Sequence, residues 1–259
     1  MSKDCFRHVE HVTNYHRKVE VMDPEEIRKL VSTTSYMEQA RQIIKRLILN
    51  GTYRPGERVK EAEIAQAMGV SRSPVREAVV HLANEGLIKL NPQKGAFVRD
   101  FDIREARELY EVREAVEVQA VRLAAARAGE EDLAGLRAFL DTVESTLEDH
   151  GTSTDGLRGR TPTDPYPLDL DYHREVAMLS KNERLTHYVV GVNTQLYLAK
   201  LKATAPPGRA RGAHEEHLAI YRAIESGDPD AAAEAMKLNV RNSLRNLEKS
   251  MGETEAGVF

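Results

Sequence analysis

Residues 69–88 read Gly69-Val70-Ser71-Arg72-Ser73-Pro74-Val75-Arg76-Glu77-Ala78-Val79-Val80-His81-Leu82-Ala83-Asn84-Glu85-Gly86-Leu87-Ile88, and this stretch decides how the chain is organised. It predicts a turn, a helix that Ser71 caps and Gly86 ends, and the start of a strand. Apolar residues recur at helical spacing on one face. Arg72, Ser73 and Arg76 fall on the other side of the first turns, so the helix presents guanidiniums and hydroxyls to solvent and suits a DNA major groove.

The flanking residues predict a complete winged helix-turn-helix over residues 36–99. A helical apolar period runs from Tyr36 to Asn50, and residues 61–68 form a second short helix directly before the stretch above. After it, residues 87–90 and 96–99 are two short β runs around a turn, which predicts a hairpin wing.

The remaining sequence is helical in pattern, and none of it alternates like a strand. We predict an N-terminal arm over residues 1–35, a linker over 100–104, an all-helical domain over 105–250 and a tail over 251–259. The fold class is therefore mainly α: an N-terminal winged helix-turn-helix with a small β-hairpin, followed by a C-terminal all-α antiparallel helical bundle.

Charge and cysteine content narrow the function further. The 259-residue chain carries a net charge of −4, of which residues 36–100 carry +4 and the remainder −8, as expected of a DNA reader joined to an acidic domain with a separate task. Cys5 is the sole cysteine, and no apolar run is long enough to cross a membrane or to form a signal peptide. We expect a cytoplasmic protein without a membrane partner.

The residues from Pro55 to Val98 resemble the DNA-binding domain of GntR-family transcriptional regulators, through Pro-Gly-Glu-Arg-Val-Lys-Glu, Gly-Val-Ser-Arg-Ser-Pro-Val-Arg-Glu-Ala, Glu-Gly-Leu-Ile and Gly-Ala-Phe-Val. The helical half resembles the VanR-like FCD domain of the FadR subfamily. The resemblance implies a homodimer that reads a palindromic DNA operator. Its implied DNA contacts are Ser71, Arg72, Ser73, Arg76, Lys94 and Gly95. Arg54, Arg58 and Lys60 are weaker candidates for phosphate contact, and the alternative for the helix is a merely solvated face.

Four residues of the second half form a candidate metal site. Asp169 and His173 are one helical turn apart, and His217 and Asn239 return to nearly the same height on two antiparallel helices. A carboxylate and two imidazoles in a bundle core can bind a divalent transition metal, and zinc or nickel is the metal that we expect. The resemblance supports this ligand set, except that Asn239 stands where the family usually has a histidine. The alternative is that these residues are hydrogen-bonded core groups or bind the effector directly.

Arg113 resembles a family position that directs an arginine at the carboxylate of a small effector, and a guanidinium can bind a carboxylate through two hydrogen bonds. The alternative is an ion pair within its own helix with Glu117, four residues on. Tyr172 and Asn193 are candidates to line the same effector cavity.

These features predict a homodimeric transcription factor, most often a repressor in this family, whose operator binding responds to a small carboxylate. One alternative is a metal-free regulator that binds a larger ligand such as an acyl thioester. A metal-dependent enzyme is less favoured, because the sequence has no His-Glu-x-x-His motif, glycine-rich phosphate loop or nucleophile elbow. We therefore predict that the protein is not an enzyme.

Overall fold

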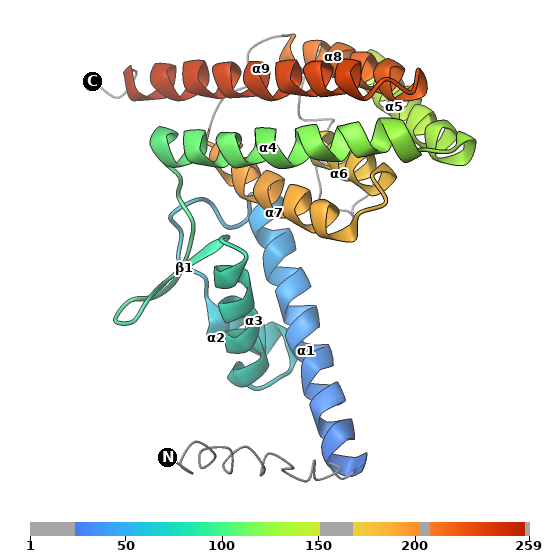
Figure 1. The fold of residues 1–259 in the computed structure, drawn as a ribbon. Coiled ribbons are helices and arrows are strands. Elements are labelled where there is room, and N and C mark those ends of the chain that lie inside the picture. Colours follow the sequence, from blue (N-terminus) through green and yellow to red (C-terminus); the bar gives the residue numbers. More distant parts are fainter. Residues whose placement is uncertain (1–23, 151–167, 203–207, 257–259) are drawn as a thin grey trace, which may run out of the picture.

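The computed structural model describes residues 24–150, 168–202 and 208–256 (Figure 1). Within these ranges the chain is helical apart from one two-stranded hairpin. In chain order the elements are α1 (Pro24–Leu49), α2 (Glu61–Met68), α3 (Arg72–Asn84), β1 (Ile88–Asn91), β2 (Gly95–Val98), α4 (Ile103–Arg127), α5 (Glu130–His150), α6 (Leu168–Leu179), α7 (Glu183–Lys200), α8 (Arg209–Glu225) and α9 (Pro229–Ala256).

The reading head, which we define as residues 36–99, consists of α2, α3, the hairpin and most of α1. Helix α3 buries an apolar stripe that includes Val75 and Leu82 against α1 and α2. Strands β1 and β2 pair antiparallel with Ile88 opposite Val98. The segment 56–59 adds to the other edge of β2 through backbone bonds, among them Val59 N to Ala96 O at 2.9 Å. Strand β2 is therefore paired with β1 along one edge and with residues 56–59 along the other.

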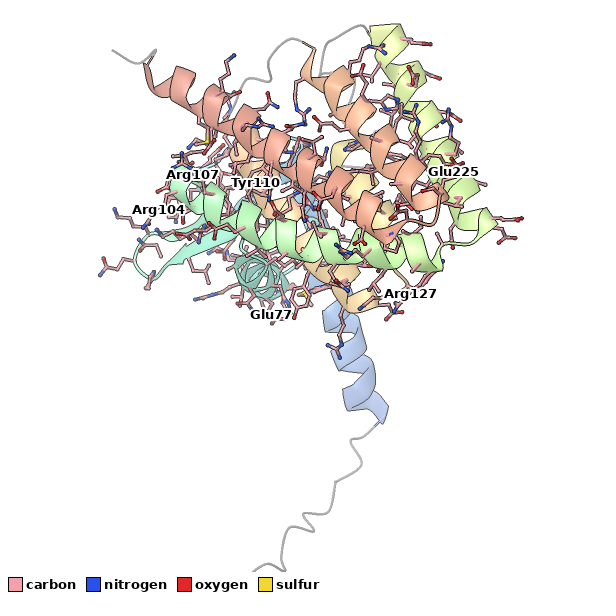
Figure 2. All side chains as sticks on the ribbon, turned by 45° about the horizontal axis from the view of Figure 1, so that its top comes forward. Glu77, Arg104, Arg107, Tyr110, Arg127 and Glu225 are labelled. Atoms are coloured by element: carbon pink, nitrogen blue, oxygen red, sulfur yellow. The ribbon has the colours of Figure 1, made fainter. Side chains whose placement is uncertain are left out.

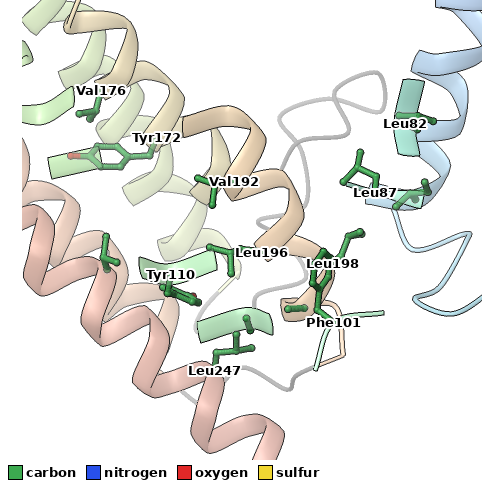
Figure 3. Packing of buried hydrophobic residues seen from close by; sticks show 14 of the residues in the cluster. Leu82, Leu87, Phe101, Tyr110, Tyr172, Val176, Val192, Leu196, Leu198 and Leu247 are labelled. Carbon is green, nitrogen blue, oxygen red and sulfur yellow. The ribbon is translucent and has the colours of Figure 1, made fainter. Parts of the chain in front are cut away.

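The helical bundle comprises α4–α9. Helices α4 and α9 run side by side across the top of the molecule in Figure 1, and α6 and α7 lie beneath α4. One apolar core continues from the head into the bundle. Phe101 and Leu198 lie at the junction, between Leu87 of the head and Leu196 of the bundle (Figure 3). The two parts are therefore packed together rather than joined by the chain alone.

Two helices extend beyond the boundaries that the sequence predicts. Helix α1 begins at Pro24 instead of near Tyr36, so residues 24–35 of the predicted arm are helical; Pro24 at a first helical position is a start signal that the missing apolar period concealed. Helix α9 continues through the predicted tail to Ala256. Helix α4 begins at Ile103, where the long helix after the hairpin is expected, because Asp102 and Glu105 form a capping box. Residues 1–23 of the arm lie outside the described residues.

Within the described ranges, every helix is too short or too polar to cross a lipid bilayer.

Candidate functional site

The N-terminal turn of α3 presents one face to solvent, while Pro74 and Val75 on its other face are buried. Ser71 occupies the N-cap position with extended backbone, but its side chain makes no capping hydrogen bond. Arg72, Ser73 and Arg76 are exposed, and the Ser73 hydroxyl donates to Glu77 Oε1 at 3.2 Å. A helix N-terminus carries unpaired backbone N–H groups and partial positive charge. Hydroxyls, guanidiniums and this terminus together form a surface suited to DNA phosphates and base edges.

The turn at the tip of the wing is held by the side chain of Asn91. The Asn91 side-chain oxygen accepts hydrogen bonds from the backbone N–H groups of Gln93 and Lys94, both at 3.0 Å. Lys94 is exposed at this tip. Gly95 has φ +98°, and a Cβ at this position would lie 3.3 Å from Nε of Arg58. The Arg58 guanidinium therefore lies near Lys94, beside the turn of the hairpin.

The three weaker candidates for phosphate contact, Arg54, Arg58 and Lys60, have different surroundings in the structure. Arg58 lies against the wing, as described. Lys60 Nζ lies 3.3 Å from Glu63 Oε1 on the neighbouring turn. Arg54 is exposed, and its backbone N–H donates to the Glu57 carboxylate at 3.1 Å. Sequence alone could not rank these cations, because the pairing of residues 56–59 with β2 is not encoded in any local pattern.

A second polar site lies inside the bundle and is centred on a buried ion pair. Arg113 and Glu117 are each 1% exposed, and Nε of Arg113 donates to Glu117 Oε1 at 2.9 Å. Other Arg113 nitrogens lie 2.6 Å from Nε2 of His173 and 3.5 Å from the Ser243 hydroxyl. Asn193 donates to the same Glu117 oxygen at 2.5 Å. We call Arg113, Glu117, His173 and Asn193 the buried cluster.

The proton positions of His173 follow from its neighbours. A guanidinium can only donate, so Nε2 of His173 accepts from Arg113. The ring proton then sits on Nδ1, which lies 2.9 Å from Glu117 Oε2. Nε2 of His173 is therefore held by Arg113, and Nδ1 lies close to Glu117 Oε2 without making a hydrogen bond to it.

The charges of the cluster are set by its own members. Burial alone would raise the pKa of Glu117, but the Arg113 guanidinium and contacts from His173 and Asn193 outweigh burial and lower this pKa to about 2. Burial, followed by the nearby Glu117 charge, raises the pKa of Tyr172 well above its usual value. The cluster thus holds one carboxylate against one guanidinium, beside a phenol that stays protonated.

The second histidine lies next to the cluster. The His217 ring stacks on Tyr172 with centroids 3.8 Å apart, and it meets the His173 ring edge-on at 5.3 Å. The Tyr172 hydroxyl donates to the backbone oxygen of His217 at 2.9 Å. Helices α6 and α8 thus bring both imidazoles to one buried place.

Asn239 belongs to a neighbouring network around Glu216. Its amide nitrogen donates to Glu216 Oε2 at 2.8 Å, and Asn242 donates to Oε1 at the same distance. Arg209 also binds this carboxylate, at 3.0 and 3.2 Å. The contact with Glu216, one residue before His217, agrees with the expected antiparallel register of α8 and α9. The side-chain oxygen of Asn239 is buried and has no hydrogen-bond partner among the described residues.

The predicted metal ligands do not form a closed set in the described part of the chain. No three His, Cys, Asp or Glu side chains converge there as a metal site. Asp169 lies in the first turn of α6, but its side chain is outside the described residues. The structure brings His173 and His217 together and binds His173 to Arg113, a contact that the sequence did not suggest.

Sequence reasoning missed two carboxylates at these sites. The sequence suggested Glu117 only as an alternative partner of Arg113. In the structure Glu117 also accepts a hydrogen bond from Asn193 and lies 2.9 Å from Nδ1 of His173. Glu216 was not considered, and its position directly before His217 was the available signal. Both roles depend on which helices pack together, which spacing within one helix does not reveal.

Comparisons with known proteins identify the families of both parts of the chain. The family described as "Bacterial regulatory proteins, gntR family" matches residues 36–98, and the FCD domain matches residues 108–242. The Nta operon transcriptional regulator of Aminobacter aminovorans is 33% identical over 70% of this chain and 80% of its own. A probable D-xylose utilization operon transcriptional repressor of Paenarthrobacter nicotinovorans is 28% identical over 89% and 96%.

A solved structure has the same arrangement. The crystal structure of a putative transcriptional regulator GntR from Rhodococcus sp. RHA1 aligns with a TM-score of 0.67 at 25% identity, over 84% of this chain and 99% of its own. The chain is therefore a DNA-binding transcriptional regulator, not an enzyme, and it belongs to the GntR family with a C-terminal FCD domain.

Proposed function

We propose that this regulator is a homodimeric repressor that binds a palindromic operator through α3 and the wing, and that a small carboxylate bound in the helical bundle changes its operator affinity. The observation that carries the proposal is Arg113, a guanidinium that is 1% exposed in a domain distinct from the reading head. A buried charge needs partners and contributes little net stability. Such a group is more readily explained by ligand binding than by folding. A regulator of chromosomal operators works in the cytoplasm, where its DNA is.

The effector is expected to be a carboxylate because Arg113 already binds one. Glu117 engages Nε, and the two terminal nitrogens face His173 and Ser243. A ligand carboxylate can take both terminal nitrogens in a bidentate contact. Tyr172 and Asn193 would then border the ligand. Repression is supported by the name of the relative from P. nicotinovorans.

We also propose a divalent metal beside this ligand, with zinc or nickel as the expected ion. The candidate donors are His173, His217, the Asn239 oxygen and Asp169. The buried oxygen of Asn239, without a hydrogen-bond partner among the described residues, fits such a role. When bound, the metal would supply positive charge for an anionic ligand. Nε2 of His173 has one lone pair, so it serves either Arg113 or a metal. Metal binding at His173 would therefore release the Arg113 guanidinium, which is the group that we expect to hold the effector.

Dimerisation is proposed through the outer face of α4 and α9. Between these helices lies a groove of about 450 Å³ whose lining includes Ala115, Val118 and Leu244. Val112 and Leu238 beside it are 52% and 55% exposed. Tyr110, which Figure 2 labels on α4, also lines this groove and is buried.

The proposed occupant of this groove is a second copy. Glu111 and Glu114 lie on the α4 side of the groove, and Lys237 and Arg241 lie on the α9 side. Glu114 binds Arg241 within one copy at 3.0 Å, and around a two-fold axis α4 of one copy can also face α9 of the other with opposite charges. Val112→Glu combined with Leu238→Glu should yield monomers in sedimentation equilibrium, and an unchanged dimer would exclude this face.

The effector proposal is tested by a thermal-shift screen of small carboxylic acids, with zinc and with chelator, on wild-type protein and on Arg113→Lys. An effector should raise the melting temperature and change the affinity for an operator duplex. Its effect should be much weaker in Arg113→Lys, which keeps the charge but loses the two-bond geometry. Equal stabilisation of both proteins would contradict the role of Arg113.

The metal proposal has its own readout. Elemental analysis of protein purified without chelator should find a bound divalent metal. Asn239→His should bind zinc more tightly, because imidazole is a better ligand for zinc than an amide oxygen. Protein without metal, together with unchanged zinc affinity of Asn239→His, would remove the metal from the proposal and leave the carboxylate.

A further inference from the structure

We propose that helix α7 couples the buried cluster to the reading helix α3, with Gln195 as the positioning residue that holds the head. This inference rests on the effector response proposed above. It goes further by naming the residues through which a change in the bundle reaches the DNA-reading surface.

The outer contact of α7 is made at the C-terminal end of α3. Nε2 of Gln195 donates to the backbone oxygen of Glu85 at 3.1 Å, and Glu85 is the residue that ends α3. Gly86 has φ +75°, and a Cβ there would lie 2.7 Å from Cδ of Gln195. Only a glycine combines this backbone conformation with so close an approach. The Gln195 side chain therefore lies directly on the end of the reading helix.

Glu85 is also the point where α1 is attached. Its carboxylate accepts from Nη1 of Arg41 at 2.7 Å and from Nζ of Lys45 at 3.0 Å. The backbone of Glu85 is thus held by α7 and its side chain by α1. A displacement of α7 relative to the head acts on α1 and α3 together.

The inner contact of α7 is made in the buried cluster. Asn193 is 3% exposed and donates to Glu117 Oε1 at 2.5 Å. Residues two apart on an α-helix are about 200° apart around its axis. Asn193 therefore faces the cluster, and Gln195 faces the head. Because the helix backbone is continuous between them, a rotation that follows a change at Glu117 also moves Gln195.

The rest of the junction has an apolar part and two ion pairs beside the linker. Leu87, Phe101 and Leu198 form its apolar part. Apolar contact is non-directional, so it keeps the head attached but resists small sliding movements weakly. A hydrogen bond requires a defined direction. The contacts of Arg99 with Glu105 and of Lys202 with Asp100 are directional too, but they hold the linker between β2 and α4. Gln195 is the polar contact made on the end of α3 itself, and we infer that it holds the angle of α3 against the bundle.

The test uses hydrogen–deuterium exchange on the full-length protein without DNA or ligand. Gln195→Ala should raise the exchange rate of the Gly86 and Leu87 amides roughly 2- to 10-fold, the equivalent of one ordinary hydrogen bond. Gln195→Glu should behave alike, because a carboxylate cannot donate. His187→Ala, an exposed change on the same helix, is the matched control and should leave these amides unchanged.

Coupling is tested by a double-mutant cycle. Asn193→Ala should raise exchange at the same two amides in the wild-type background but add nothing in the Gln195→Ala background. Equal increments in both backgrounds, or none in either, would overturn the coupling through Gln195.

A final readout separates positioning from general destabilisation. Operator duplexes are selected from random sequence with wild-type protein, and the spacing between half-sites is then varied by one or two base pairs. Gln195→Ala should flatten the preference for one spacing, whereas a merely destabilised protein would lose affinity at all spacings alike. An unaltered spacing preference would refute the proposal. Neither experiment needs an effector, so a failed carboxylate screen leaves these results independent.

Discussion

The reading head and the buried cluster use the same guanidinium chemistry in opposite surroundings. Arg72 and Arg76 are exposed, whereas Arg113 is 1% exposed and bound to Glu117. Water solvates the exposed pair, so its charges can be left available for DNA. Burial removes that solvation, and a charge inside the bundle must be satisfied by the fold itself. A ligand meets available donors at the head, but in the bundle it must displace a partner that is already present.

The largest effect that tests this contrast is expected at Glu117. Glu117→Ala leaves Arg113 buried without its carboxylate, so the free energy of unfolding should fall by about 3–5 kcal/mol in urea titrations. Asp141→Ala is the matched control, because it removes the exposed partner of Arg137 in an i,i+4 pair on α5 and should change stability little. Similar losses for both variants would mean that burial does not distinguish the two pairs.

The pH dependence of the same carboxylate follows from its pKa. Glu117 ionises near pH 2 in the fold, against 4.5 for an ordinary glutamate. Its contribution is therefore fully present above pH 4.5 and is lost as the pH falls toward 2, by about 3 kcal/mol in all. Urea titrations across this range should show a smaller acid loss for Glu117→Gln than for wild type. Parallel pH profiles of the two proteins would contradict the lowered pKa.

How much the sequence could predict differs between the two regions for the same reason. The reading head can be predicted largely from local sequence. Its helices, the wing and the exposed side chains follow from contiguous residues with helix caps and apolar periods, although the pairing of residues 56–59 with β2 does not. The buried cluster draws Arg113, His173 and Asn193 from three helices, and its hub Glu117 was visible only as an i,i+4 partner. The link between Asn239 and Glu216 likewise arises only when α8 packs on α9.

A change at the head should affect DNA binding without affecting the fold. Arg76→Ala should weaken operator binding about 10- to 100-fold in titrations at moderate salt, the loss of a guanidinium contact to a base or phosphate. Its melting temperature should stay near that of wild type, because Arg76 is exposed. Arg137→Ala, an exposed change on α5, serves as the control for charge alone. Unchanged affinity of Arg76→Ala would remove α3 as the reading helix.

The smallest effects compare two helix N-caps, one in each region. Asp102 caps α4 with a side-chain bond from the Glu105 N–H at 2.7 Å, whereas the Ser71 side chain makes no such bond at α3. Asp102→Ala should therefore cost about 0.5–2 kcal/mol in thermal or urea unfolding. Ser71→Ala should cost little stability but weaken operator binding several-fold, because a hydroxyl not used by the fold remains available to a phosphate. If Ser71→Ala lowers stability as much as Asp102→Ala and leaves operator affinity intact, Ser71 is a structural cap, and the contrast between available and committed polar groups does not extend to the helix ends.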